Sequence, residues 1–202
     1  MAARGYGFLG WNTRYRGNEA FFLLEHALVD IGAGVRWLKE EAGIEQVVIL
    51  GNSGGGSLMG AYQSQALGVT MTPTPNLKLP EALNDLIPAD LYVSLCSHLG
   101  RPEVLTDWID ASITDETDPS SIEPSLNMYD PVNGPPYSDE FIGRYRAAQE
   151  ARNHRITDWC HSELIRLRSL DMFDRAFNVY RTWADLRLMD GNLDPSEREI
   201  GR

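Results

Sequence analysis

A single serine stands in a sequence setting that favours nucleophilic chemistry. Residues 51–55, GNSGG, follow the pattern G-x-S-x-G between the apolar run VVIL and a segment that predicts a helix. A strand-turn-helix of this kind is tight enough to strain the backbone of Ser53, and the flanking glycines avoid collisions with the strand and the helix. The Ser53 hydroxyl then projects above the carboxyl ends of the strands, where open sheets bind ligands. We expect the N–H of Gly54 to face the position of a developing oxyanion.

Other interpretations compete for the same residues. A flexible linker has polar flanks, whereas this segment lies between an apolar strand and an amphipathic helix. A phosphate loop ends in Gly-Lys-Ser or Gly-Lys-Thr, and this stretch has no lysine. The dinucleotide pattern G-x-G-x-x-G does not fit in a register with an acidic residue about 20 positions later. Binding of an anion at the N-terminus of the following helix stays open. Ser57 is the competing serine, and its place predicts a residue of the first helical turn.

The elements around the turn predict a parallel sheet. The runs QVVIL (46–50) and DLYVSLCS (90–97) predict strands, and the first is apolar enough to be covered on both faces. Residues 57–67 between them predict a helix, which gives a strand-helix-strand crossover. Nearer the N-terminus, GYGFLGW (5–11) predicts another buried strand, and an Asn18 N-cap predicts the start of a long helix.

The second half of the chain has a different character. Between Pro102 and Gly143 there are ten acidic residues, six prolines and no lysine, arginine or histidine. This composition predicts a long irregular segment with at most short helices. Ser138 then N-caps a predicted helix at 139–169, whose apolar residues alternate with arginines. The acidic segment and the arginine-rich helix either pack together or form two separately solvated faces, and both alternatives stay open.

Composition and charge narrow the classes of protein. The chain has 202 residues, of which 43% are hydrophobic and 23% charged, as in soluble globular proteins. Its formal net charge of −11 argues against nucleic acid as a partner, since phosphate binding needs a basic surface. No apolar run approaches the roughly 18 residues of a membrane helix or forms a signal peptide, so we expect a cytoplasmic protein with no membrane span. Cys96 and Cys160 lack metal-like spacing, and we expect reduced, core-facing thiols with no metal and no cofactor.

Together with its flanks, the turn resembles the nucleophile elbow of the α/β-hydrolase superfamily. Three segments carry the resemblance. The fourth strand of that fold and the loop after it are similar to ARGYGFLGWNTRYRG. The nucleophile strand and elbow are similar to VVILGNSGGG, and the sixth strand is similar to DLYVSLCSH. The resemblance implies an α/β fold with a mostly parallel sheet: residues 1–100 would be the central part of the hydrolase core, and residues 101–202 a largely helical lid or cap. It further implies a serine hydrolase acting on an ester or similar acyl bond of a small molecule, with Ser53 as nucleophile and Gly54 as oxyanion-hole residue.

The resemblance also indicates what is missing. In this family an acid and then a histidine follow the nucleophile, after further strands, and neither has an assignable counterpart here. His98, which closes the strand at 90–97, is the histidine nearest to the expected active-site edge. We therefore expect a fragment of a longer hydrolase, or a short homologue whose exposed sheet edges are covered by a second copy or a partner. The alternative function is a non-catalytic, hydrolase-like binding or interaction module.

Overall fold

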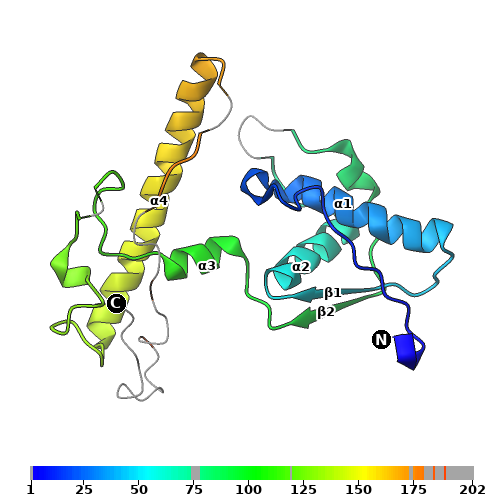
Figure 1. The fold of residues 1–202 in the computed structure, drawn as a ribbon, viewed down its shortest axis with the longest axis horizontal. Coiled ribbons are helices and arrows are strands. Elements are labelled where there is room, and N and C mark those ends of the chain that lie inside the picture. The colour runs from blue at the N-terminus through cyan, green and yellow to red at the C-terminus, as the bar shows by residue number, and fades with distance from the viewer. Residues whose placement is uncertain are drawn as a thin grey trace. The chain divides into compact units, whose positions relative to one another are not determined.

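The computed structural model describes residues 2–73, 78–118, 120–172, 175–179, 184 and 189 (Figure 1). It divides into two compact units, Met1–Gly100 and Arg101–Arg202, each with its own hydrophobic core. The described residues form a two-stranded parallel sheet and four α-helices, so the chain is an α/β protein with a helical part. None of the described helices combines the length and the apolar character needed to cross a bilayer.

The first unit is a strand-helix-strand crossover. β1 (Val48–Asn52) and β2 (Leu91–Leu95) are parallel and pair residue for residue, from Val48 with Leu91 to Asn52 with Leu95. α2 (Gly54–Leu67) lies between them in the chain, close to the helix that the sequence predicts at 57–67. The order strand, helix, parallel strand is therefore confirmed.

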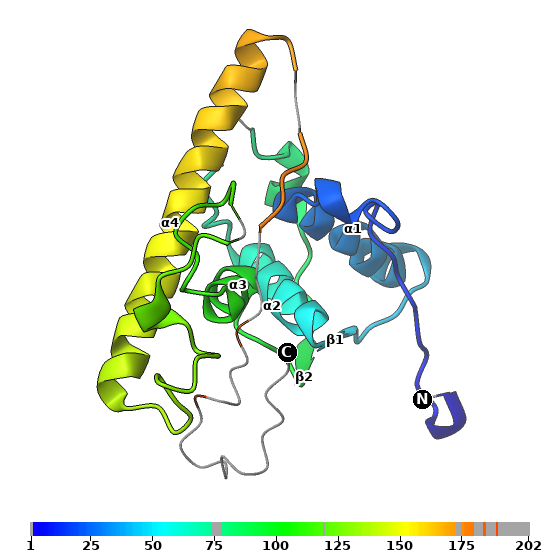
Figure 2. The same ribbon diagram turned by 60° about the vertical axis from the view of Figure 1, so that its left-hand side comes forward.

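A second helix precedes the crossover. α1 (Leu24–Arg36) continues as a π-helical turn at Trp37–Glu41, and it lies beside α2 in both views (Figures 1 and 2). The prediction that this helix begins after Asn18 is wrong, because Asn18 makes no side-chain cap and precedes only a 3-10 turn at Glu19–Phe21. Further 3-10 turns occupy Ala2–Arg4 and Glu81–Asp85.

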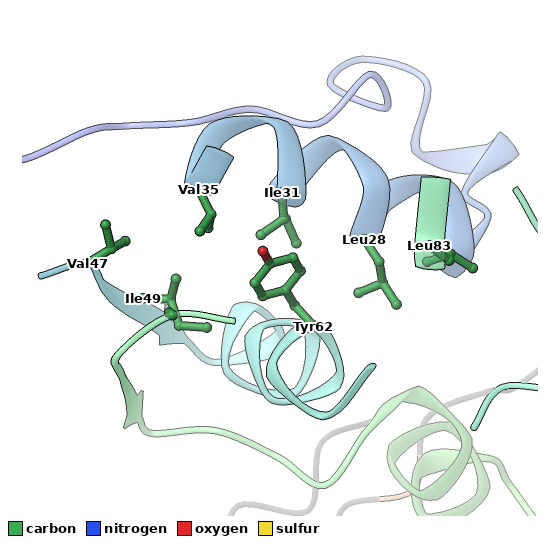
Figure 3. Close-up of a cluster of buried hydrophobic side chains, with 8 residues drawn as sticks. Leu28, Ile31, Val35, Val47, Ile49, Tyr62 and Leu83 are labelled. Atoms are coloured by element: carbon green, nitrogen blue, oxygen red, sulfur yellow. The ribbon is translucent and has the colours of Figure 1, made fainter. Parts of the chain in front are cut away.

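The core of the first unit is formed by α1, α2 and β1. Tyr62 points from α2 toward α1 and is fully buried (Figure 3). Its hydroxyl donates to the carbonyl oxygen of Ile87 at 2.5 Å, and burial raises the pKa of the phenol to about 12. The buried hydrophobic residues of this cluster are Leu28, Ile31, Val35, Val47, Ile49, Tyr62, Leu83 and Ala89. Tyr62 belongs to the middle of α2 and packs against the other residues of this cluster. This packing fixes α2 relative to β1.

The sheet is buried on one face only. Ile49 and Gly51 of β1 are buried, whereas Val48 and Leu50, which alternate with them, are exposed. Leu91, the partner of Val48 on β2, is 56% exposed. The prediction that β1 is covered on both faces is therefore wrong in the described structure, because α1 and α2 lie on the face that carries Ile49.

Residues 5–11 do not form the predicted strand. Tyr6 and Phe8 are 66% and 76% exposed, and no described strand pairs with this segment. Trp11 is attached to α1 instead, since its Nε1–H donates to the carbonyl oxygen of Asp30 at 2.7 Å and its ring covers Gly34. An apolar aromatic run becomes a strand only where a neighbour satisfies its backbone N–H and C=O groups, and the described residues provide no such neighbour.

The second unit is built around one long helix. α4 (Asp139–Ser169) has the bounds that the sequence predicts, and Ser138 caps it by accepting a hydrogen bond from the Phe141 N–H at 3.1 Å. Among its described residues, the acidic segment before α4 contains α3 (Arg101–Trp108) and a 3-10 turn at Pro124–Leu126 as its only helices. The prediction of an irregular segment with short helices is therefore confirmed.

The acidic segment packs against α4 through buried polar contacts. Arg152 is fully buried, and its Nε and Nη2 donate to the two carboxylate oxygens of Glu116 at 2.7 and 2.8 Å. Its Nη1 donates to the carbonyl oxygen of Asp110 at 2.5 Å. Gln149, which is also fully buried, donates to the carbonyl oxygen of Ile109 at 2.9 Å. Of the two alternatives that the sequence leaves open, packing of the two segments is the one observed.

Candidate active site at the serine turn

The turn between β1 and α2 holds Ser53 in a strained backbone conformation. Ser53 has φ 54° and ψ −123°. Residues with side chains rarely adopt such a combination, which costs on the order of 1–3 kcal/mol. Ser53 is exposed, and no described residue forms a hydrogen bond with its hydroxyl. The strain predicted from the sequence pattern is therefore present, and it presents the hydroxyl at the surface.

Backbone hydrogen bonds hold the turn on both sides. The Ser53 N–H donates to the carbonyl oxygen of Leu95 at 2.9 Å, which extends the ladder of β1 and β2 by one residue. The Gly56 N–H donates to the carbonyl oxygen of Ser53 at 3.0 Å, and the Tyr92 hydroxyl donates to the carbonyl oxygen of Gly56 at 2.6 Å. These bonds fix the serine relative to the ends of both strands.

Close contacts require two of the glycines around Ser53. A Cβ atom on Gly51 would lie 2.2 Å from the carbonyl oxygen of Gly55, and a Cβ atom on Gly56 would lie 1.6 Å from Ser97 Oγ. Gly55 differs, because no described atom lies within 4 Å of its Cβ position. The prediction that glycines at both ends of the pattern prevent collisions is therefore right for Gly51 and wrong for Gly55. The second glycine that prevents a collision is Gly56.

The chain leaving β2 passes the serine turn. Cys96 has φ 45°, an uncommon value for a residue other than glycine. It is exposed, so the prediction of a core-facing thiol is wrong at this position, which lies just beyond the end of the strand. Ser97 follows and fills the space beside Gly56, where its Oγ accepts a hydrogen bond from Ser94 Oγ at 2.7 Å. The positive φ of Cys96 is thus part of how the chain returns to the turn.

His98 lies beside the residue that follows Ser53. Its Nε2 is 3.3 Å from the position that a Cβ atom would take on Gly54. Its Nδ1 is buried and has no hydrogen-bond partner among the described residues. His26 belongs to α1, and His154 and His161 are exposed on α4 of the second unit. Within the described first unit, the structure therefore brings one histidine to the serine turn.

Gly54 stands at the N-terminus of α2 with an unused N–H. It is the first residue of a helix of 14 residues, where N–H groups have no carbonyl acceptor within the helix. No described group outside the helix accepts a hydrogen bond from it. The partial positive charge of the helix N-terminus favours an anion at this place. Ser57, the competing serine, lies in the first turn of α2 as the sequence predicts, and its hydroxyl donates to the carbonyl oxygen of Gly54 at 3.0 Å.

The chemistry that these groups offer is acyl transfer. Three groups lie together at this turn: the strained serine, the free N–H at the helix N-terminus and the imidazole of His98. Within the described ranges, no group of three or more histidine, cysteine, aspartate or glutamate side chains is arranged to hold a metal ion.

Comparisons with known proteins found no relative. No protein-family model matches the chain, and no curated protein or solved structure matches it either. The resemblance to α/β-hydrolases therefore stays a prediction, and its support is the serine turn and the parallel strands beside it.

Sequence reasoning did not predict the contact between Gly56 and Ser97. A signal for it existed, because G-x-S-x-G explains glycines at positions 51 and 55 and leaves the third consecutive glycine unexplained. A serine directly after a predicted strand is a small residue that can pack against such a glycine. His98, which closes the predicted strand, directly follows this serine in the sequence.

Proposed function

We propose that this protein is a serine hydrolase of the α/β-hydrolase type, acting on an ester or similar acyl bond of a small molecule. Ser53 is the nucleophile, and the Gly54 N–H is one donor to the oxyanion. The observation that carries the proposal is the positive φ of an exposed serine between a parallel strand and a helix. Backbone strain at a residue with a side chain persists where the surrounding structure enforces it, and it is concentrated at functional sites.

The reaction follows from the groups at the turn. The Ser53 oxygen attacks the carbonyl carbon, and the new oxyanion accepts a hydrogen bond from the Gly54 N–H at the positive end of α2. Collapse of this intermediate expels the alcohol and leaves an acyl group on Ser53. Water then attacks the acyl group, releases the acid and restores the serine hydroxyl.

Several broader expectations belong to the same proposal. Residues 101–202 would serve as a lid or cap, the protein would be cytoplasmic, and no cofactor would be needed. In the described residues β1 and β2 pair only with each other, so each has one edge without a strand partner. Exposed strand edges favour association, and we propose that a second copy or a partner protein covers them.

Covalent labelling tests the proposed nucleophile. A fluorophosphonate probe forms a bond between serine Oγ and phosphorus and releases fluoride, and it reacts only with activated serines. We expect the wild-type chain to be labelled on the peptide that contains Ser53, and Ser53→Ala to be unlabelled. Ser57→Ala is the matched control from the same turn and should be labelled like the wild type, because its hydroxyl is bound to the backbone.

Two outcomes would count against this proposal. Equal labelling of Ser53→Ala and the wild type would show that another residue reacts. Complete lack of labelling of a folded wild-type chain would favour the alternative, a non-catalytic binding module built on the same turn.

A further inference from the structure

We infer that His98 is the base that accepts the proton of Ser53, so that the two residues form a catalytic pair within the first unit. This inference rests on the proposed function and adds a catalytic residue to it. A serine hydroxyl is a weak nucleophile until a neighbouring base takes its proton, and the sequence alone leaves this base unassigned.

The first argument is the position of the imidazole. Its Nε2 lies against Gly54, which carries the N–H proposed for the oxyanion and directly follows Ser53. A base for a serine must lie within hydrogen-bond reach of that hydroxyl or reach it as the substrate complex tightens. In the described first unit the only other histidine is His26, which belongs to α1. Within this unit, His98 is therefore the histidine that lies at the serine turn.

The second argument is how the structure holds the ring. The segment that follows β1 and the segment that follows β2 meet beside this ring. The Ser53 N–H donates to the carbonyl oxygen of Leu95, and the chain then turns at Cys96, two residues before His98. Because Gly54 has no side chain, the His98 ring can lie close to it. A Cβ atom on Gly54 would be 3.3 Å from His98 Nε2. Ser53 directly follows β1 and His98 comes three residues after β2, so both residues leave the same end of the two paired strands.

The third argument concerns the buried Nδ1. In a catalytic triad a carboxylate accepts a hydrogen bond from this nitrogen and stabilises the imidazolium. Here Nδ1 is buried and no described residue bonds to it. Because the imidazolium lacks this support, we expect a slow pair: loss of the orienting acid in a serine protease lowers kcat by about 10⁴.

The proton moves as follows. As Ser53 Oγ bonds to the acyl carbon, its proton passes to His98 Nε2 and the carbonyl electrons move to the oxyanion. When the intermediate collapses, the same proton goes to the leaving alcohol, and Nε2 is free again. Water repeats the cycle on the acyl-enzyme, giving one proton to Nε2 and its oxygen to the acid product, and Nε2 returns that proton to Ser53 Oγ as the second intermediate collapses. One ester and one water are converted to one acid and one alcohol.

The test is the rate of fluorophosphonate labelling of Ser53 in two variants, His98→Ala and His98→Asn. We expect both rates to fall by about 10²-fold, the lower end of the usual contribution of a general base, because no described carboxylate supports the imidazolium. Added imidazole should restore labelling of His98→Ala, because it fills the space and supplies the base, and it should have no effect on Ser53→Ala. His154→Gln is the matched control, an exposed histidine on α4, and should be labelled at the wild-type rate.

A second measurement uses the wild-type chain and does not depend on how the variants fold. A histidine-acylating reagent should slow labelling in proportion to modification of His98, located by mass spectrometry, and independently of modification of His154. The inference would be overturned by unchanged labelling in both His98 variants, or by a loss of labelling that imidazole does not restore. In either case, labelling of Ser53 in the wild-type chain would still support the proposed function. A wild-type chain that is not labelled overturns both.

Discussion

Replacing Gly51 by alanine is expected to destabilise the first unit by about 3 kcal/mol, the upper part of the range for overpacking. The added methyl group would lie 2.2 Å from the carbonyl oxygen and 2.5 Å from the carbonyl carbon of Gly55, and 2.6 Å from Cα of Gly56. All three are backbone atoms, which cannot move aside by rotation of a side chain. The first turn of α2 must therefore shift away from β1, and Ser53 shifts with it.

Gly55→Ala is the matched control for this substitution. It adds the same methyl group four residues later, where no described atom lies within 4 Å. Gly55 is the second residue of α2, and alanine favours a helix over glycine by up to about 1 kcal/mol. We therefore expect unchanged or slightly higher stability in urea denaturation followed by far-ultraviolet circular dichroism. Fluorophosphonate labelling should be lost in Gly51→Ala and kept in Gly55→Ala, and equal behaviour of the two variants would contradict the contacts described at Gly51.

Local patterns predicted the elements whose formation depends on neighbouring residues in the chain. The Ser138 cap and the pattern after it predicted α4 with the observed bounds. The strain at Ser53 followed from residues 51–55, because a strand that runs straight into a helix leaves few backbone angles for the residue between them. In both places the decisive contacts lie within a few residues of the chain.

Features that depend on distant contacts were not predictable in this way. Residues 5–11 have the composition of a strand, but a strand also needs a partner, and the described chain has none for them. His98 lies beside Gly54 after the chain turns at Cys96, whose positive φ nothing in its residue type indicates. The buried face of α4 includes Gln149 and Arg152, and hydrophobic periodicity does not find buried polar residues.

Those buried polar residues carry the second prediction with a large effect. Removing the carboxylate in Glu116→Ala should destabilise the second unit by about 3–5 kcal/mol, because it takes away the carboxylate that accepts two hydrogen bonds from the buried guanidinium of Arg152. Arg152→Met should cost clearly less. It removes the charge itself, fills most of the same volume, and leaves Glu116, whose side chain is 28% exposed, able to bind water.

Arg166→Gln provides the control on the same helix, since Arg166 is half exposed and its partner Glu163 keeps a second ion pair with Arg175 at 2.8 Å. Because the Arg166 end of this pair is open to solvent, the pair contributes about 0–1 kcal/mol. Urea denaturation followed by far-ultraviolet circular dichroism, which reports on α4, measures all three variants. If Arg152→Met proved as destabilising as Glu116→Ala, the cost would come from lost packing and lost backbone hydrogen bonds. The acidic segment would then be held to α4 by the shape of the arginine side chain, with its charge contributing little.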